Sequence, residues 1–321
     1  MDLTPKQIYE EFSNKHINNE TAFDLLTSII ENNENEDVRL DAIKNLEKVG
    51  INTYDLFSFL ENLLISDSNS MIRNAAAKFL KHKFLEKIIN PLKWAIQHES
   101  DFECRITIIQ TLEEIKSHES KLILLNEVKK IIKTKFLNKA RKIENKKYKK
   151  VIKKLIKTKQ IISFTHTNLA EILINYLTIL NLINQYPNVY YELNPRTGLV
   201  NELDLSDYLE YEVKGTPFGW KNNIQSTSEI PGLTYLKSLT KIDLSNNIIE
   251  NVKELIHLKN LTNLILTNNK ISEIENLNYI KSLKSLEYLD LRGNELGNKI
   301  SLDEFDKKIK VLLKEFYIKI K

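Results

Sequence analysis

A nine-residue pattern that occurs three times decides the fold of this chain. Residues 239–247 read LTKIDLSNN, residues 261–269 read LTNLILTNN, and residues 286–294 read LEYLDLRGN. Each has apolar residues at its first, fourth and sixth positions and asparagine at its ninth, and the starts are 22 and 25 residues apart. Repeats of this length indicate structural units that stack on one another and share a continuous core.

The pattern resembles the short leucine-rich repeats of intracellular binding proteins, and the resemblance covers residues 199–297. In that family the apolar positions face the core, and the strands form a parallel sheet on the concave face of a solenoid. The asparagine of each repeat bonds backbone groups where the strand turns. The resemblance therefore implies that Asn247, Asn269 and Asn294 form an internal ladder that is structural and not catalytic.

The two ends of this domain carry different signals. Residues 189–193 and 199–205 are strand-like and flank the turn sequence NPRTG, which predicts a hairpin that caps the start of the solenoid. The repeat frame is lost between residues 209 and 228, where we expect an inserted loop. Its Trp220 is either an anchor for a partner or a side chain that folds back over the first repeat.

After the last repeat, Ser301 begins a capping pattern that predicts a final helix. The apolar residues on one face of that helix would be Phe305, Ile309, Leu312, Leu313 and Phe316. We expect this face to close the end of the solenoid, whose core must be shielded from water.

A second, looser repeat occupies the first 120 residues. Residues 38–43 read VRLDAI, residues 72–77 read IRNAAA and residues 104–109 read CRITII, with starts 34 and 32 residues apart. Another apolar helical stretch precedes each of them. The pattern resembles HEAT-like repeats, in which helix pairs stack into an α-solenoid. Arg39, Arg73 and Arg105 would either form a ladder that binds an anion or tie neighbouring repeats together.

Positive charge is concentrated between residues 129 and 159, which contain 15 Lys or Arg and a single acid, Glu144. This segment carries +14, so the rest of a chain with net charge +4 carries −10. Its apolar residues recur at helical spacing, which predicts a basic amphipathic helix. The candidate anion-binding residues are Lys146, Lys147, Lys149, Lys150, Lys153 and Lys154.

Three interpretations of this helix stay open. It is a solvated connector docked by its apolar stripe, a surface for nucleic-acid phosphates or anionic lipids, or a protein contact that includes the acidic parts of this same chain. No aromatic platform or base-reading motif accompanies the lysines, so the sequence does not support sequence-specific recognition.

Little in the sequence favours catalysis. The chain has seven glycines and no glycine-rich phosphate loop or nucleophile elbow, and its six histidines show no metal-binding spacing. We expect no enzyme activity, cofactor, metal or small-molecule substrate. The single cysteine, Cys104, implies no disulfide, and we see no signal peptide, so a cytoplasmic location is expected.

The residues between the leucines are the candidate site, because side chains alternate along a strand and these positions project from the concave face. Aligning the repeats gives columns across that face. One column is Asp204, Asp243, Ile265 and Asp290; the next is Glu202, Lys241, Asn263 and Tyr288; the third is Ser206, Ser245, Thr267 and Arg292. The first column is mostly acidic and favours a partner with a basic or mixed surface.

The sequence thus predicts two solenoids. Residues 1–126 would form HEAT-like helical repeats, residues 127–187 a basic helical connector, and residues 188–321 an α/β leucine-rich-repeat domain with a parallel concave sheet. The function expected is that of a non-catalytic scaffold or adaptor for partner proteins, with nucleic-acid or anionic-membrane binding by residues 129–159 as the alternative. The candidate partner-binding residues are Glu202, Asp204, Asp243, Ile265, Tyr288, Asp290 and Arg292.

Overall fold

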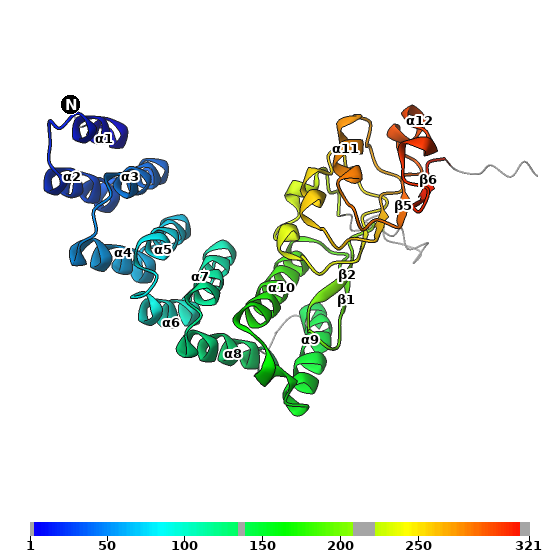
Figure 1. Ribbon diagram of the computed structural model, residues 1–321, viewed down its shortest axis with the longest axis horizontal. Coiled ribbons are helices and arrows are strands. Elements are labelled where there is room, and N and C mark those ends of the chain that lie inside the picture. Colours follow the sequence, from blue (N-terminus) through cyan, green and yellow to red (C-terminus); the bar gives the residue numbers. More distant parts are fainter. Residues whose placement is uncertain (1–2, 134–138, 208–221, 315–321) are drawn as a thin grey trace, which may run out of the picture. The chain divides into compact units, whose positions relative to one another are not determined.

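The computed structural model describes residues 3–133, 139–207 and 222–314 (Figure 1). The chain divides into two compact units. The first comprises Met1–Asn126 and Thr165–Ala170, and the second comprises Glu127–Phe164 and Glu171–Lys321.

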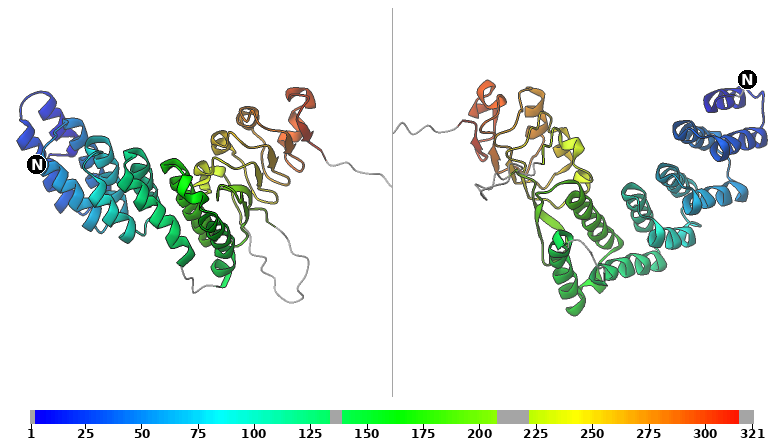
Figure 2. Two further views of the ribbon diagram at one scale, coloured as in Figure 1. Left: turned by 60° about the horizontal axis from the view of Figure 1, so that its bottom comes forward. Right: turned by 180° about the vertical axis from the view of Figure 1, so that it is seen from behind.

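Paired and stacked helices build the first unit (Figure 2). The helices from its beginning onward are α1 (Pro5–Ser13), α2 (Asn19–Asn32), α3 (Glu36–Val49), α4 (Tyr54–Ser66), α5 (Ser70–Phe84), α6 (Ile89–His98), α7 (Phe102–Ile115) and α8 (His118–Lys133). Helix α2 packs against α3, α4 against α5, and α6 against α7, while α3, α5 and α7 also pack in a row. The looser sequence repeat therefore corresponds to the helix pairs of an α-solenoid.

The repeated apolar positions form the core of this unit. Ala42, Ala76 and Ile108 occupy equivalent places in α3, α5 and α7, and all three are fully buried. The larger Ile108 is accommodated, and α7 still packs closely against α5.

Two of the repeated arginines link neighbouring helix pairs. Arg39 donates from Nε to Ile30 O (2.5 Å) and forms an ion pair with Asp67, which caps the end of α4. Arg73 binds Glu99 through two parallel hydrogen bonds of 2.7 and 2.8 Å. For these two residues the contacts support the structural interpretation and not an anion ladder.

The Arg73–Glu99 pair changes the titration of its carboxylate, which is only 3% exposed. Burial raises the pKa of Glu99, but the hydrogen bonds from Arg73 and from the backbone N–H of Asp101 outweigh burial and lower the pKa to about 2. The carboxylate therefore stabilises the folded state above its ordinary pKa of 4.5, and this contribution is lost as the pH falls toward 2.

The second unit contains the end of α8, then α9 (Lys139–Lys157), the 3-10 turn η1 (Gln160–Ser163) and most of α10 (His166–Gln185). Residues 172–179 of α10 are all buried, and no helix in the described parts of the chain is long and apolar enough to cross a membrane. Within α10, Asn175 Oδ1 accepts a hydrogen bond of 2.9 Å from Val200 N, so this helix helps to place the first parallel strand.

A six-stranded sheet follows, with its strands in sequence order (Figure 1). The strands are β1 (Tyr190–Leu193), β2 (Val200–Asp204), β3 (Lys241–Asp243), β4 (Asn263–Ile265), β5 (Tyr288–Asp290) and β6 (Lys310–Leu312). β1 and β2 pair antiparallel, which confirms the predicted hairpin, and every later pair is parallel. Residues 208–221, which contain most of the expected loop and Trp220, lie outside the described residues.

The three repeated asparagines form the ladder that the resemblance implied, and each is less than 10% exposed. Their Nδ2 groups donate to a leucine carbonyl in the preceding repeat: Asn247 to Leu205 (3.0 Å), Asn269 to Leu244 (2.9 Å) and Asn294 to Leu266 (2.8 Å). Their Oδ1 atoms accept from the backbone N–H groups of Ile224, Ile249 and Ile271. Each amide thus satisfies backbone groups that would otherwise be buried without partners.

The prediction of a final helix from Ser301 is wrong. Ser301 caps only the short 3-10 turn η5 (Leu302–Glu304), and residues 310–312 form β6 instead. Lys310 N donates to Glu287 O at 2.8 Å, so β6 satisfies backbone groups beside β5 that a helix would have left unpaired. Phe316 lies outside the described residues.

The 25-residue repeat that starts at residue 261 differs from the others on the side opposite the sheet. Two earlier repeats have 3-10 turns there, η3 (Leu233–Tyr235) and η4 (Lys253–His257). The 25-residue repeat has the α-helix α11 (Glu275–Lys281) in the same place, so its extra residues are absorbed as helical turns.

Replacing Asn269 with Ala should lower the free energy of unfolding by about 1–3 kcal/mol, because buried backbone groups of two repeats lose their partner. Urea unfolding followed by circular dichroism measures this change. Asn298→Ala is the control, since Asn298 is exposed, and its effect should stay within about 0.5 kcal/mol. Equal effects of the two substitutions would contradict the ladder.

Replacing Glu99 with Gln should destabilise the protein near neutral pH by about 2–3 kcal/mol. The difference from the unchanged protein should shrink as the pH falls from 4.5 toward about 2, where both carry an uncharged side chain. Thermal unfolding across this pH range measures the gap. Glu86→Gln, at an exposed position, should show no such convergence; a pH-independent gap for Glu99→Gln would refute the lowered pKa.

Candidate functional site

The parallel register of the sheet places the predicted columns in line. Pairing joins Glu202 to Lys241, Asn263, Tyr288 and Lys310 in one row, and Asp204 to Asp243, Ile265, Asp290 and Leu312 in the other. The residues between the two rows, Leu203, Ile242, Leu264 and Leu289, are buried in the core. The two rows therefore lie on the opposite side of the sheet from the core, as alternation along a strand requires.

Two carboxylates lie side by side at the β2–β3 end of this face. Asp204 Oδ1 accepts from Ser206 N (2.9 Å) and Oγ (2.6 Å), and Asp243 Oδ1 accepts from Ser245 N (2.9 Å) and Oγ (2.7 Å). Neighbouring strands are about 4.8 Å apart, and the two aspartates are in register. Among the described residues, neither carboxylate forms an ion pair.

This pairing affects the titration of Asp243. Burial raises the pKa of its carboxyl, and the neighbouring Asp204 raises it further. The hydrogen bonds from Ser245 and the charge of Lys241 oppose these effects without cancelling them. At this end of the face, strands β2 and β3 thus carry the three carboxylates of Glu202, Asp204 and Asp243 against the single cation Lys241.

At the opposite end of the face, the charge of Asp290 is neutralised by Arg292 of the same repeat. Asp290 is 2% exposed and accepts hydrogen bonds from Arg292 Nε (3.0 Å) and Nη2 (2.6 Å). Burial raises the pKa of Asp290, but the bonds from Arg292 prevail and lower it. Tyr288 and Arg292 are the half-exposed groups here, while Asp290 acts as the counterion of Arg292. The two aspartates at positions 243 and 290 are equivalent in sequence and differ in environment.

Between the two ends lies a less polar zone. Ile265 is half-buried on β4 between Asp243 and Asp290. Lys310 Nζ lies 5.7 Å from the centre of the Tyr288 ring, a cation–π distance. At the β2–β3 end, in the neighbouring row, Glu202 and Lys241 form a half-exposed ion pair of 3.6 Å. Along the row of Asp204, the face thus runs from two adjacent carboxylates through the apolar Ile265 to Asp290, which Arg292 neutralises.

The basic helix α9 docks on the sheet through one lysine. Lys147 Nζ donates to Tyr191 O (2.8 Å), forms an ion pair of 3.2 Å with Glu192 and lies 3.7 Å from the centre of the Tyr190 ring. Hydrogen bonds from Tyr190 and Lys147 lower the pKa of Glu192 against a smaller effect of burial. Of the predicted anion-binding residues, Lys147 is therefore an internal anchor, whereas Lys146, Lys150, Lys153 and Lys154 are exposed.

Sequence reasoning missed the tyrosines behind α9. The ring centre of Tyr148 lies 5.1 Å from that of Tyr176 and 5.7 Å from that of Tyr191. Burial raises the pKa of Tyr148 well above its ordinary value. The one signal in the sequence was that Tyr148 occupies an apolar position of the α9 pattern. Its partners Tyr176 and Tyr191 lie far away in the sequence, so their contact with it could not be predicted.

Sequence reasoning also missed Asn222. Its Nδ2 donates to Leu205 O at 2.8 Å, the carbonyl that Asn247 also bonds, and to Asn188 O at 2.9 Å. Asn222 therefore extends the asparagine ladder toward the hairpin. The disrupted frame around it concealed this role.

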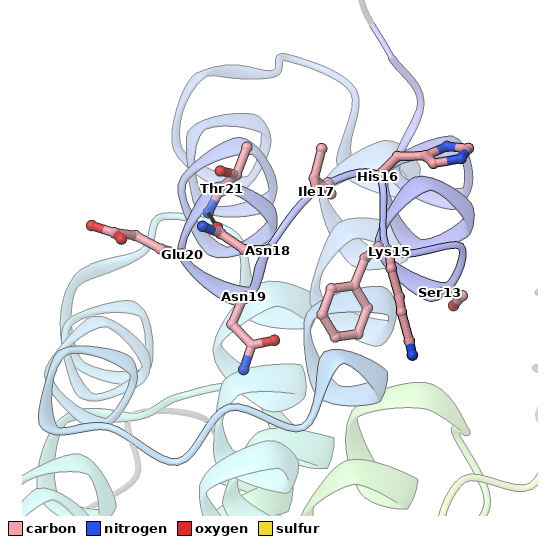
Figure 3. A pocket seen from close by; sticks show the side chains of 9 residues that line it. Ser13, Lys15, His16, Ile17, Asn18, Asn19, Glu20 and Thr21 are labelled. Atoms are coloured by element: carbon pink, nitrogen blue, oxygen red, sulfur yellow. Dashed lines mark hydrogen bonds between the residues drawn. The ribbon is translucent and has the colours of Figure 1, made fainter.

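A pocket at the turn between α1 and α2 offers no competing site (Figure 3). Its polar side chains are exposed, and His16 and Glu20 point away from each other. His16 contacts Glu11 at 2.8 Å instead. Across residues 3–133, 139–207 and 222–314, no group of His, Cys, Asp and Glu could hold a metal ion.

Comparison with known families agrees with this architecture. Residues 23–112 match a family model of HEAT repeats, and residues 259–307 match a model of leucine-rich repeats in two copies. No curated protein and no solved structure matches the chain. The chain thus combines HEAT repeats in its N-terminal part with leucine-rich repeats in its C-terminal part, and both are typical protein-interaction modules.

Replacing Lys147 with Met should weaken the docking of α9 by about 1–2 kcal/mol, because the aliphatic part is kept while the charge-assisted bonds are lost. Hydrogen exchange of the α9 and β1 amides should become faster. Lys150→Met, which changes an exposed lysine on the same helix, should leave exchange unaltered. Unchanged exchange in Lys147→Met would show that the tyrosines alone hold α9.

Proposed function

We propose that this protein is a non-catalytic scaffold that binds a basic segment of a partner protein on the concave face of its leucine-rich repeats. Asp204 and Asp243 carry the proposal, since they are adjacent, share no counter-ion among the described residues and carry more negative charge than their surroundings offset. A lysine or arginine of a partner placed between them would interact with both carboxylates at once.

The neighbouring residues indicate which other side chains the partner's bound segment should carry. Ile265 lies one strand beyond Asp243, and Tyr288 lies on the strand after that. A partner side chain that is apolar and about 5–10 Å from its cation would pack there. Glu202 at the edge and Arg292 at the far end would add polar contacts at the rim, where such contacts contribute mostly to orientation.

The helix pairs of the first unit offer a second protein-binding surface. Repeat arrays expose extended faces that are suited to binding because each repeat contacts only its neighbours. A scaffold role would join the two repeat types in one chain. A cytoplasmic location fits the buried, free thiol of Cys104, whose pKa is raised by burial so that it is poorly reactive.

A second candidate function is the binding of nucleic acid or an anionic membrane through α9. The exposed lysines on this helix favour it, because most of the chain's excess positive charge lies between residues 129 and 159. It is compatible with a scaffold role, since the concave face and the exposed side of α9 are different surfaces.

Replacing Asp204 and Asp243 with Asn should weaken binding of basic peptides at least about tenfold, since two carboxylates are lost while the serine hydrogen bonds can persist. Fluorescence anisotropy with labelled peptides that carry a lysine pair followed by leucine measures the change. Lowering the pH should also weaken binding, and at a higher pH than for an ordinary aspartate because the pKa of Asp243 is raised.

The control is Glu250→Gln with Glu273→Gln, which removes the same charge at exposed positions outside the strands. It should change affinity by less than about twofold. Equal losses in both variants would mean that overall charge drives binding, and the absence of any binding by basic peptides would refute the concave-face proposal.

A further inference from the structure

A row of lysines runs along the exposed side of α9. Lys146, Lys150, Lys153 and Lys157 are separated by four, three and four residues, which places them on one face of a helix. All four are exposed, whereas Tyr148, Ile152 and Leu155 on the other side of the helix are buried. At a rise of about 1.5 Å per residue, the row is about 16 Å long.

Within the described residues, no acid forms an ion pair with Lys146, Lys150, Lys153 or Lys157. The lysine of α9 that forms an ion pair with a described residue is Lys147, whose partner is Glu192. Some lysines elsewhere in the chain do have an acidic partner, for example Lys281 with Glu304 and Lys81 with Glu114. Four like charges about 5–6 Å apart repel one another, so a ligand with regularly spaced negative charges would relieve the repulsion.

The other side of α9 is firmly held, which fixes the row in place. Tyr148 packs between the rings of Tyr176 and Tyr191. Gly198 of the hairpin also lies beside the helix, where a Cβ at that position would be in van der Waals contact with Leu155 Cδ1 at 3.4 Å. Because this apolar side is packed inside the protein, α9 cannot insert it into a lipid surface as an interfacial helix does.

Two further cations adjoin the end of the row. Gln160 Nε2 donates to Arg196 O at 2.8 Å, which brings the hairpin turn with the exposed Arg196 beside the C-terminal end of α9. Lys159 precedes that contact and is also exposed. The cationic surface therefore continues from the helix onto the hairpin.

We propose that the row of Lys146, Lys150, Lys153 and Lys157 binds the phosphodiester backbone of duplex nucleic acid without reading its sequence. The inference specifies the ligand of the second candidate function and is independent of the concave face. A narrow, straight row fits a linear polyanion. The row consists of lysines, which contact phosphates as point charges, and it lacks the arginine forks that read guanine.

The absence of an exposed aromatic side chain on the row favours duplex over single strands. Proteins that hold single strands commonly stack bases on aromatic side chains. In the described part of α9 the aromatic residue is Tyr148, and it is buried. Recognition here would depend on charge alone, so affinity should fall steeply with salt.

The test uses the full chain and a fluorescein-labelled DNA duplex of about 20 base pairs, with anisotropy measured between about 50 and 200 mM salt. The row variant replaces Lys146, Lys150, Lys153 and Lys157 with Gln. We expect at least tenfold weaker binding at the lowest salt, and a log–log salt slope that is shallower by about 3 to 4, since each phosphate contact contributes about 0.9.

The matched control replaces four exposed lysines of the leucine-rich repeats, Lys237, Lys253, Lys259 and Lys270, with Gln. It has the same net charge as the row variant and should bind within about twofold of the unchanged protein. Circular dichroism of both variants confirms that they are folded.

Three outcomes would overturn the inference. They are no binding of the duplex at the lowest salt, equal losses in the row variant and the control, and row-dependent binding of phosphatidylserine vesicles without binding of the duplex. Basic-peptide binding is measured on the same preparations. If it persists while the duplex does not bind, the nucleic-acid inference fails and the proposed concave-face function stands.

Discussion

The hydrogen bonds of the buried asparagines are the constraint on which the candidate site depends. Each amide donates to a carbonyl of the preceding repeat and also accepts from a backbone N–H of that preceding repeat, as Asn269 does with Leu244 O and Ile249 N, so adjacent strands are held in one register. That register places Asp243 directly beside Asp204 and Ile265. The leucines supply the apolar burial that drives folding, while the amides determine which surface side chains become neighbours.

A related device operates in the helical unit with different chemistry. There a guanidinium reaches from one helix pair to the carboxylate that begins the next linker, as Arg73 does to Glu99. Both arrangements use a polar side chain of one repeat to satisfy groups of a neighbour. Because the Arg73–Glu99 link involves charge and the asparagine ladder does not, acid should weaken this link before it affects the ladder.

Much of the fold was predictable from the sequence because each repeat needs the same kinds of side chain at the same positions, so the pattern occurs several times. The helix pairs and the columns of the face follow from repeated residues, the asparagine ladder was implied by the resemblance to leucine-rich repeats, and the hairpin was indicated by two strand-like stretches around a turn sequence. The C-terminal strand was not predictable, because β6 lacks the nine-residue pattern and its conformation depends on pairing with β5. Residues 301–316 have apolar spacing that also suits a helix, and tertiary pairing decided between the two.

The candidate site was predictable only in part. The surface positions of the repeats could be aligned into columns from the sequence. The burial of Asp290 could not be predicted, because it depends on Arg292 folding back over it, and the spacing of residues in the sequence does not reveal that contact. The role of Lys147 was hidden for another reason, since its partners Tyr191 and Glu192 lie 44 and 45 residues away. Six lysines that look alike in sequence therefore divide into an anchor and surface residues only in three dimensions.

The nearest-neighbour character of the ladder has a consequence for how such a face can evolve. Adding or deleting one whole repeat would preserve every amide bond between the repeats that remain, so the fold would tolerate it. The recognition features would shift in steps of one strand, about 4.8 Å. Distances between the acidic and apolar side chains on this face can therefore change only by whole strand spacings. To keep binding after such a change, a partner would have to alter the distance between its own cationic and apolar side chains by a comparable amount.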